Sequence, residues 1–315
     1  MEPAPGTLLE ESETPGSPDR GVGAERREAP PPDGDAPASA EEGGPLANLS
    51  PSRASDFKTC PQLFKFRHVD RLPSIPTPAQ ARGTAVHLAL ERLFLLPADE
   101  RRPERLLELF DVAWEETLEE DEYRELFAEN PDSREEFHRH GREVAERYFQ
   151  IEDPRVLEPL ERELHISLVI DEGNPRQDDD RRLEIRGVID RLDPAPGGGF
   201  VITDYKTGRA PPLRFADSSF FALKVYALMI QENHHRTPDL VRLLYLGNSE
   251  AHSLPVSRTQ LRGVKKQLQA LWWAIDRAIS TGTFPTRKTR LCDWCSYQPI
   301  CPAWADEPPS PDPDI

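Results

Sequence analysis

Long apolar runs are missing from this chain of 315 residues, and their absence excludes one large class of protein. No apolar stretch approaches the roughly 18 residues that a membrane-spanning helix needs, and the opening residues lack the pattern of a signal peptide. We therefore expect a cytoplasmic protein with no membrane partner. In that compartment the four cysteines are poor candidates for structural disulfides, which persist in oxidising environments.

Basic charge is also scarce. The chain has 39 Lys and Arg against 56 Asp and Glu, a formal net charge of -17, and only seven of the basic residues are lysines. This balance argues against a nucleic-acid binder that relies on a broad basic surface, although a focused basic cleft around metal ions remains compatible with it. The sequence also lacks a G-x-x-x-x-G-K-(S/T) loop, so any ATP-driven unwinding must come from another protein.

Proline is abundant, with 33 residues, and it is concentrated towards the two ends of the chain. Residues 1–48 combine Pro, Gly, Ser and Ala with many acidic residues and show no periodic apolar pattern, which predicts a disordered acidic arm. Residues 305–315 predict a disordered tail for the same reason. The folded part is therefore expected to be one domain that spans residues 49–304.

Apolar periodicity in the folded part predicts helices first and strands later. The expected early helices, the first of them capped by Ser52, lie at residues 52–57, 61–66, 77–96, 103–120 and 133–149. The expected strands lie at residues 157–170, 183–192, 200–205, 240–246 and 252–256, with an acidic turn at 171–180. Later helices are expected at 218–231 and 257–281, and Ser257 is the expected N-cap of the second. This order predicts an α/β core with a helical insertion before it.

The second and third expected strands flank a glycine-rich turn near Gly197 and predict a β-hairpin. Opposed residues of an antiparallel pair have a constant index sum, which places Asp190 opposite Asp204. Lys206 lies two residues beyond Asp204, so the two side chains project from the same face. Opposed Cβ atoms are about 4.5–5.5 Å apart, close enough for two carboxylates to share one cation beside a lysine.

Two carboxylates and a lysine in this arrangement suit a metal-dependent hydrolase that acts on phosphate esters. Mg²⁺ prefers oxygen ligands, and bound ions activate water and offset the charge that develops on phosphate oxygens. The spacing alone leaves a second interpretation open, in which these residues form an ion pair on a solvated strand. Glu163 in the first strand is either an additional carboxylate near the site or a surface glutamate.

The same residues resemble a known family. Gly187-Val188-Ile189-Asp190 followed by Asp204-Tyr205-Lys206-Thr207-Gly208 resembles the RecB-like exonuclease branch of the PD-(D/E)XK nucleases, with its G-h-(I/V)-D and (D/E)-x-K-T motifs, where h is apolar. Arg82-Gly83-Thr84-Ala85-Val86-His87 is similar to the G-x-x-x-H helix of that branch. The resemblance implies a restriction-endonuclease-like core, in which a mixed central sheet is flanked by helices.

The resemblance also implies the roles of individual residues. His87, Asp190, Asp204 and the backbone carbonyl of Tyr205 would bind Mg²⁺ or Mn²⁺, and Lys206, Asp204 and Asp190 would be catalytic. One departure concerns the helix after the lysine, where the branch usually carries Gln-x-x-x-Tyr. Tyr226 fits the tyrosine, but Ala222 stands where the glutamine is expected.

The four cysteines form a compact set: Cys292, Cys295 and Cys301 lie close in sequence, and Cys60 precedes the core. Three ligands on one loop and a distant fourth suit a tetrahedral Zn²⁺ site or an iron–sulfur cluster, whereas free buried thiols are the alternative. The placement resembles the iron–sulfur nuclease domains of AddB and of CRISPR-adaptation exonucleases. That resemblance implies one [4Fe–4S] cluster, which would clasp the N-terminal helix to the C-terminal segment.

Taken together, the motifs predict a metal-dependent DNA exonuclease that acts on single strands or DNA ends in recombination, repair or CRISPR adaptation. Its expected partners are DNA and a helicase or CRISPR-adaptation protein. The alternative is a catalytically weak, DNA-end-binding iron–sulfur scaffold subunit. A minority of the basic residues near the motifs is expected to contact phosphate: Arg82, Arg186, Arg191, Arg209, Arg214, Lys224, Arg287, Lys288 and Arg290.

Overall fold

The computed structural model describes residues 48–74, 76–170, 182–212 and 219–305, all of which belong to one unit, Gly44–Ile315. The expected arm, tail and acidic turn lie outside these residues, except at their innermost positions. Within the described part of the chain, no helix combines the length and the apolarity that crossing a membrane requires.

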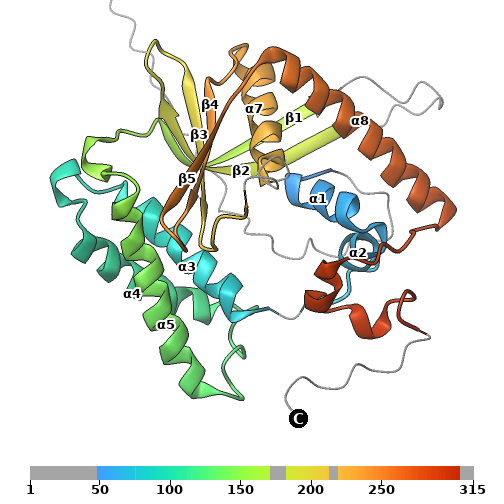
Figure 1. The fold of residues 1–315 in the computed structure, drawn as a ribbon, viewed down its shortest axis with the longest axis horizontal. Helices are drawn as coiled ribbons and strands as arrows, with labels where there is room; N and C mark the ends of the chain where they lie inside the picture. The colour runs from blue at the N-terminus through green and yellow to red at the C-terminus, as the bar shows by residue number, and fades with distance from the viewer. Residues whose placement is uncertain (1–47, 75, 171–181, 213–218, 306–315) are drawn as a thin grey trace, which may run out of the picture. The chain divides into compact units, whose positions relative to one another are not determined.

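A five-stranded mixed sheet forms the centre of the fold (Figure 1). Its strands, in spatial as well as chain order, are β1 (Glu161–Ile170), β2 (Leu183–Pro194), β3 (Phe200–Lys206), β4 (Leu240–Tyr245) and β5 (Glu250–Pro255). Only β3 and β4 run parallel, and the other three neighbouring pairs are antiparallel. The predicted α/β class, with a mixed central sheet, is confirmed.

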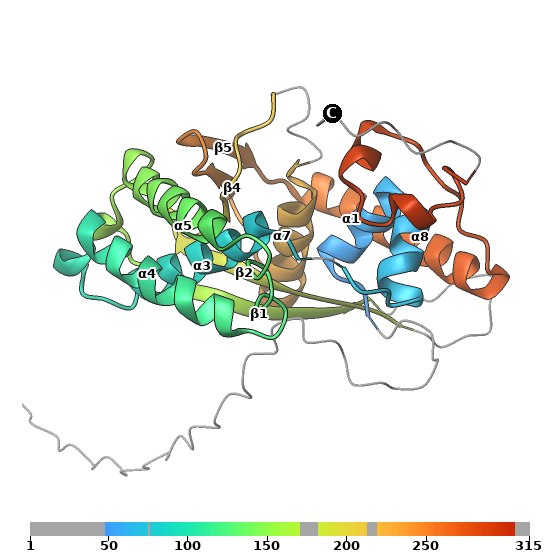
Figure 2. The same cartoon turned by 90° about the horizontal axis from the view of Figure 1, so that it is seen from below.

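One face of the sheet is covered by α1 (Pro51–Thr59), α7 (Phe221–His234) and α8 (Arg258–Thr281). Helix α7 connects the parallel strands β3 and β4, which cannot be joined by a tight turn. These helices bury an apolar cluster against Ile185, Ile202 and Leu243 of the sheet. Figures 1 and 2 show α7 and α8 on the side of the sheet away from α3–α5.

The opposite face is covered by the predicted helical insertion, which consists of α3 (Pro78–Leu93), α4 (Pro103–Glu119) and α5 (Pro131–Glu146) (Figure 2). Its core contains Phe110 and Trp114 and reaches Leu244 of β4. Leu243 and Leu244 are adjacent yet belong to different cores, because successive side chains of a strand point to opposite faces. The sheet is therefore buried on both sides.

Short helical segments connect the long elements of the described chain. They are α2 (Pro61–Phe64), η1 (Lys65–Val69), η2 (Ala98–Glu100), η3 (Arg147–Gln150), η4 (Pro154–Val156), η6 (Arg290–Trp294) and η7 (Gln298–Ile300). Strand β1 begins at Glu161, later than predicted, because residues 157–160 form an irregular connection between η4 and the strand.

The N-caps follow the sequence with one correction. Thr77 and Ser257 form capping boxes at α3 and α8, and the cap of α8 at Ser257 is the predicted one. The cap of α1 is Ser50 and not Ser52, because the fixed φ of Pro51 suits the first helical position. The side chain of Ser50 accepts a hydrogen bond from the Arg53 backbone N–H at 3.2 Å.

Two helix glycines should respond oppositely to alanine. A Cβ at Gly141 would overlap the ring of Phe110, which is fully buried, whereas a Cβ at Gly263 meets nothing within 4 Å. We expect Gly263→Ala to raise the free energy of unfolding by about 1 kcal/mol through helix propensity. Gly141→Ala should lower it by about 1–2 kcal/mol, since overpacking outweighs the same propensity gain. Urea unfolding measures both, and a stabilised Gly141→Ala would contradict the packing of α5 on α4.

Candidate functional site

Helix α3 places His87 against the end of β3. The His87 Nε2 atom lies 3.0 Å from the backbone carbonyl oxygen of Tyr205, at hydrogen-bond distance. His87 Nδ1 lies 3.4 Å from Asp190 Oδ2. His87 therefore lies between a carbonyl oxygen and a carboxylate oxygen, and both are ligand types that a divalent cation prefers.

The hairpin register is the predicted one, but the ladder ends just before the site. The pair Arg191 and Thr203 has the index sum that places Asp190 opposite Asp204. At Asp190 the side chain, and not the backbone carbonyl, makes the hydrogen bond to the next strand: Asp190 Oδ2 accepts from the Tyr205 N–H at 2.8 Å. The two strands therefore separate where the carboxylates lie.

Glu163 completes a group that can hold a metal ion. The regular β1–β2 register on either side places it opposite Asp190, and its own backbone departs from the ladder, with a φ of 43°. One ligand atom each from His87, Glu163 and Asp190 lie within 4.8 Å of one another. Burial, assisted by the nearby charge of Asp190, raises the pKa of Glu163 to about 7. This is the geometry of a cation site whose ion offsets crowded carboxylates.

Asp204 and Lys206 form an ion pair beside this group. Lys206 Nζ lies 2.7 Å from Asp204 Oδ2, as their shared strand face predicts. Asp204 is buried, and its Oδ2 has no hydrogen bond of good geometry among the described residues, so Lys206 satisfies it by charge alone. Burial raises the pKa of Asp204 to about 6, assisted by Asp190 and opposed by Lys206. Desolvation lowers the pKa of Lys206, but the carboxylates outweigh it and the net pKa is raised.

A buried network anchors Tyr205 from behind. The Tyr205 hydroxyl accepts a hydrogen bond from Arg191 Nη1 at 2.8 Å. Arg191 is fully buried and ion-paired with Glu152 and Asp193. Burial alone would raise the pKa of Glu152, but the hydrogen bond and charge of Arg191, with the charge of Arg242, together outweigh it and the pKa is lowered. Arg191 is therefore a positioning residue, and its prediction as a candidate phosphate contact is wrong.

Helix α7 brings Tyr226 to the opposite side of the site. A Cβ at Gly187 would lie 2.6 Å from Tyr226 Cε1, so the glycine of the G-h-(I/V)-D motif provides the space for this ring. Burial raises the pKa of Tyr226, and the charges of Asp204 and Asp190 add to the shift. Ala222, in the usual glutamine position, is partly buried and packs against the apolar cluster under α7.

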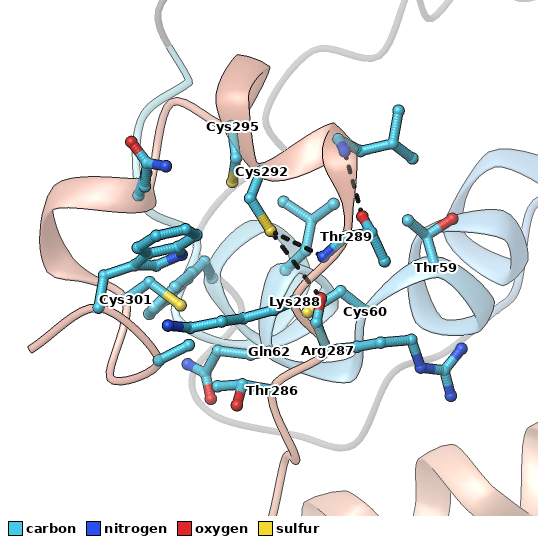
Figure 3. A pocket seen from close by; sticks show the side chains of 16 residues that line it. Thr59, Cys60, Gln62, Thr286, Arg287, Lys288, Thr289, Cys292, Cys295 and Cys301 are labelled. Carbon is cyan, nitrogen blue, oxygen red and sulfur yellow. Dashed lines mark hydrogen bonds between the residues drawn. The ribbon is translucent and has the colours of Figure 1, made fainter. Parts of the chain in front are cut away.

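The four cysteines line one cavity between α1–α2 and the C-terminal segment (Figure 3). Burial raises the pKa of Cys301, and the thiols of Cys60, Cys295 and Cys292 raise it further, so all four are neighbours. Cys292 Sγ accepts a hydrogen bond from the Thr289 N–H at 3.4 Å. No three of these sulfur atoms, all of which are described, lie within 4.8 Å of one another.

The structure brings together His87, Asp190 and the Asp204–Lys206 pair, and it adds two features that the sequence does not resolve. The sequence favours a surface position for Glu163 at least as much as a place in the site, and the β1–β2 register places it opposite Asp190. The Glu152–Arg191 anchor was missed, because a fully buried arginine has no periodic signature of its own. Of the other candidate phosphate contacts, Arg186 pairs with Glu184, and Arg214 lies outside the described residues.

A mixed sheet that carries a histidine–carboxylate group beside an aspartate–lysine pair defines the metal-dependent nuclease class. The chain belongs to the PD-(D/E)XK nuclease superfamily, whose family model matches residues 48–302. No curated protein matches it. Among solved structures it is similar to a protein from Eubacterium rectale named "Putative exonuclease", with 11% identity, 79% of this chain and 86% of that chain covered, and a TM-score of 0.47. It is also similar to the protein SSO0001, with 11% identity, 82% and 88% coverage, and a TM-score of 0.40.

Metal affinity should depend on pH in a defined direction. Asp204 and Glu163, with pKa values raised to about 6 and about 7, are protonated at lower pH and must lose those protons to a cation. We expect Mn²⁺ affinity, measured by calorimetry, to rise by about tenfold per pH unit for each displaced proton and to level off above these pKa values.

Two variants of β1 test the source of this dependence. Glu163→Gln should make the profile shallower, whereas Glu161→Gln, an exposed neighbour on the same strand, should leave it unchanged. A flat profile in the unmodified protein would contradict the described crowding of carboxylates.

Proposed function

We propose that this protein is a metal-dependent DNA exonuclease of the RecB-like branch, with residues 49–304 as its nuclease domain. It would hydrolyse phosphodiester bonds of single-stranded DNA or of DNA ends in recombination, repair or CRISPR adaptation. The observation that carries the proposal is the convergence of His87, Glu163 and Asp190 beside the Asp204–Lys206 pair.

The residues present fit a hard divalent cation such as Mg²⁺ or Mn²⁺. Carboxylate and carbonyl oxygens are the ligands that such a cation prefers. The buried Asp204 Oδ2 has no hydrogen-bond partner among the described residues, and a bound cation would satisfy it. His87, Asp190, Asp204 and the Tyr205 carbonyl oxygen would hold it, with Glu163 as a further carboxylate. When bound, the ion would supply Lewis-acid activation of water and offset phosphate charge.

Lys206 would act on the substrate directly. Its side chain is 46% exposed while its ammonium stays against Asp204, so it can reach a phosphate without leaving the ion pair. Its raised pKa keeps it protonated, and it would orient the attacking water and donate hydrogen bonds to a phosphate oxygen. The Arg191 anchor would keep the Tyr205 carbonyl in place through the reaction.

We further propose that the four cysteines hold a [4Fe–4S] cluster. The four thiols line one cavity and are close enough for Cys60, Cys292 and Cys295 to affect the pKa of Cys301, which suits a cluster in which each cysteine binds a different iron. The backbone N–H groups of Thr289 and Ala303 already hydrogen-bond to the sulfur atoms of Cys292 and Cys301.

A second candidate function is a DNA-end-binding scaffold that cuts slowly or not at all, as a subunit beside a helicase or a CRISPR-adaptation protein. Ala222 favours it, because the polar group usually found one helical turn before Tyr226 is replaced by a methyl group that packs into the core. The presence of Asp190, Asp204 and Lys206 in one site favours the nuclease.

Cleavage assays separate the two functions. We expect anaerobically purified protein to degrade end-labelled single-stranded DNA with Mg²⁺ or Mn²⁺. Lys206→Ala and Asp190→Ala should each lower kcat by about 100-fold or more, because each removes a group that stabilises the transition state. Glu161→Gln is the matched control and should retain activity. DNA binding without cleavage under every divalent metal would instead support the scaffold.

The cluster has its own readout. We expect brown protein with broad visible absorption and equal amounts of iron and acid-labile sulfide, and loss of iron with a lower Tm in Cys301→Ala. EDTA should stop cleavage without bleaching the colour, since the two metal sites are separate. Zinc without iron in the anaerobically purified protein would refute the cluster.

A further inference from the structure

Arg82 is a partly buried cation that has no anionic partner among the residues the structure describes. It lies on α3, on the N-terminal side of His87. Its Nη1 is 3.0 Å from His140 Nδ1, and its Nε is buried without a hydrogen-bond partner. Arg82 forms no ion pair with any residue that the structure describes, and burial lowers its pKa. A desolvated guanidinium without a carboxylate costs free energy unless another anion binds it.

The neighbours of Arg82 add positive charge. Burial lowers the pKa of His140, and Arg82 and Arg147 lower it further, while Glu143 opposes them. His140 Nδ1 therefore accepts a hydrogen bond from Arg82 as a neutral ring. Glu143 is already paired with Arg139 at 2.6 Å. Arg147 forms no ion pair in the described chain, and its Nη1 donates to the carbonyl oxygen of Gly247 at 2.9 Å.

The backbone next to Arg82 and the loop that contacts Arg147 both pack against the segment that follows Lys206. A Cβ at Gly83, the neighbour of Arg82, would lie 3.7 Å from Thr207 Oγ1. The Gly247 N–H donates to the Gly208 carbonyl oxygen at 3.1 Å. Gly247, whose own carbonyl oxygen accepts from Arg147, therefore pairs with the segment that contains Thr207 and Gly208. Figure 2 shows α3 and α5 side by side on this side of the sheet.

We propose that Arg82 and Arg147 form a phosphate-binding subsite for the substrate strand, which contacts a phosphodiester next to the one that is cut. A guanidinium presents a planar fork of donors that matches two phosphate oxygens, and no carboxylate of the described residues occupies the fork of Arg82. This subsite depends on the proposed DNA nuclease function. It predicts that the substrate strand approaches the metal site from the side where α3, α5 and the Thr207–Gly208 segment meet.

A purely structural role of Arg82 makes different predictions. If Arg82 only held His140 to join α3 and α5, its loss would lower Tm and leave the salt dependence of DNA binding unchanged. A phosphate contact releases counterions, so its loss makes the dependence of log K on log salt shallower by about 0.7 for a single strand.

The test uses the full chain with Lys206→Ala, which slows cleavage during binding measurements. A labelled single-stranded oligonucleotide is titrated by anisotropy at several salt concentrations, with and without Arg82→Gln or Arg82→Lys. We expect Arg82→Gln to raise Kd about tenfold, with the shallower salt slope and an unchanged or higher Tm. Arg82→Lys should keep the slope and lose part of the affinity, because it keeps the charge without the fork.

Arg92→Gln is the matched control. Arg92 lies on α3, on the C-terminal side of His87, and is paired with Glu116 on α4 at 2.5 Å, so its loss should change neither Kd nor slope. If Lys206→Ala binds DNA and Arg82→Gln binds equally well with the same slope, the subsite is overturned while the nuclease proposal stands. If Lys206→Ala does not bind DNA at all, both proposals fall.

Discussion

Tyr205 is the residue on which the candidate site depends. Its backbone N–H binds Asp190, its carbonyl oxygen accepts from His87, and its hydroxyl accepts from Arg191. A single residue thereby joins β2, β3 and α3 through three hydrogen bonds. Hydrogen bonds in a dry environment are costly to leave unmade, so these three constrain one another and fix the carbonyl next to the acidic group.

The Arg191 network explains how this arrangement persists inside an apolar core. A guanidinium at the centre of Tyr205, Glu152 and Asp193 is charged, but its donors are satisfied by groups from three separate segments. Such a network does not add stability over an apolar core as a rule, although removing one member leaves an uncompensated charge. Its contribution is positional, since it sets the ring of Tyr205 and hence the backbone that faces His87.

The fold could be predicted where one pattern decided it. The hairpin register followed from the glycine-rich turn near Gly197, and the cap of α8 from Ser257 and Gln260. The convergence of His87 with Asp190 could be expected only from the family resemblance, because no local pattern relates a helix to a strand about a hundred residues later. Glu163 and Arg191 depend on pairing across strands and on burial, which are properties of the assembled sheet.

The contacts between the two ends of the folded chain carry a consequence for biosynthesis. Arg287 donates to the Lys58 carbonyl oxygen and Tyr297 to that of Leu72, while Leu49 bridges to Ile185 of β2. Helix α1 precedes β2 and the cysteine segment in the chain, so these contacts form only after both partners have been synthesised. The segment that carries Cys60 is therefore closed onto the C-terminal segment late in folding, whereas Leu49 can bridge to β2 as soon as that strand is available.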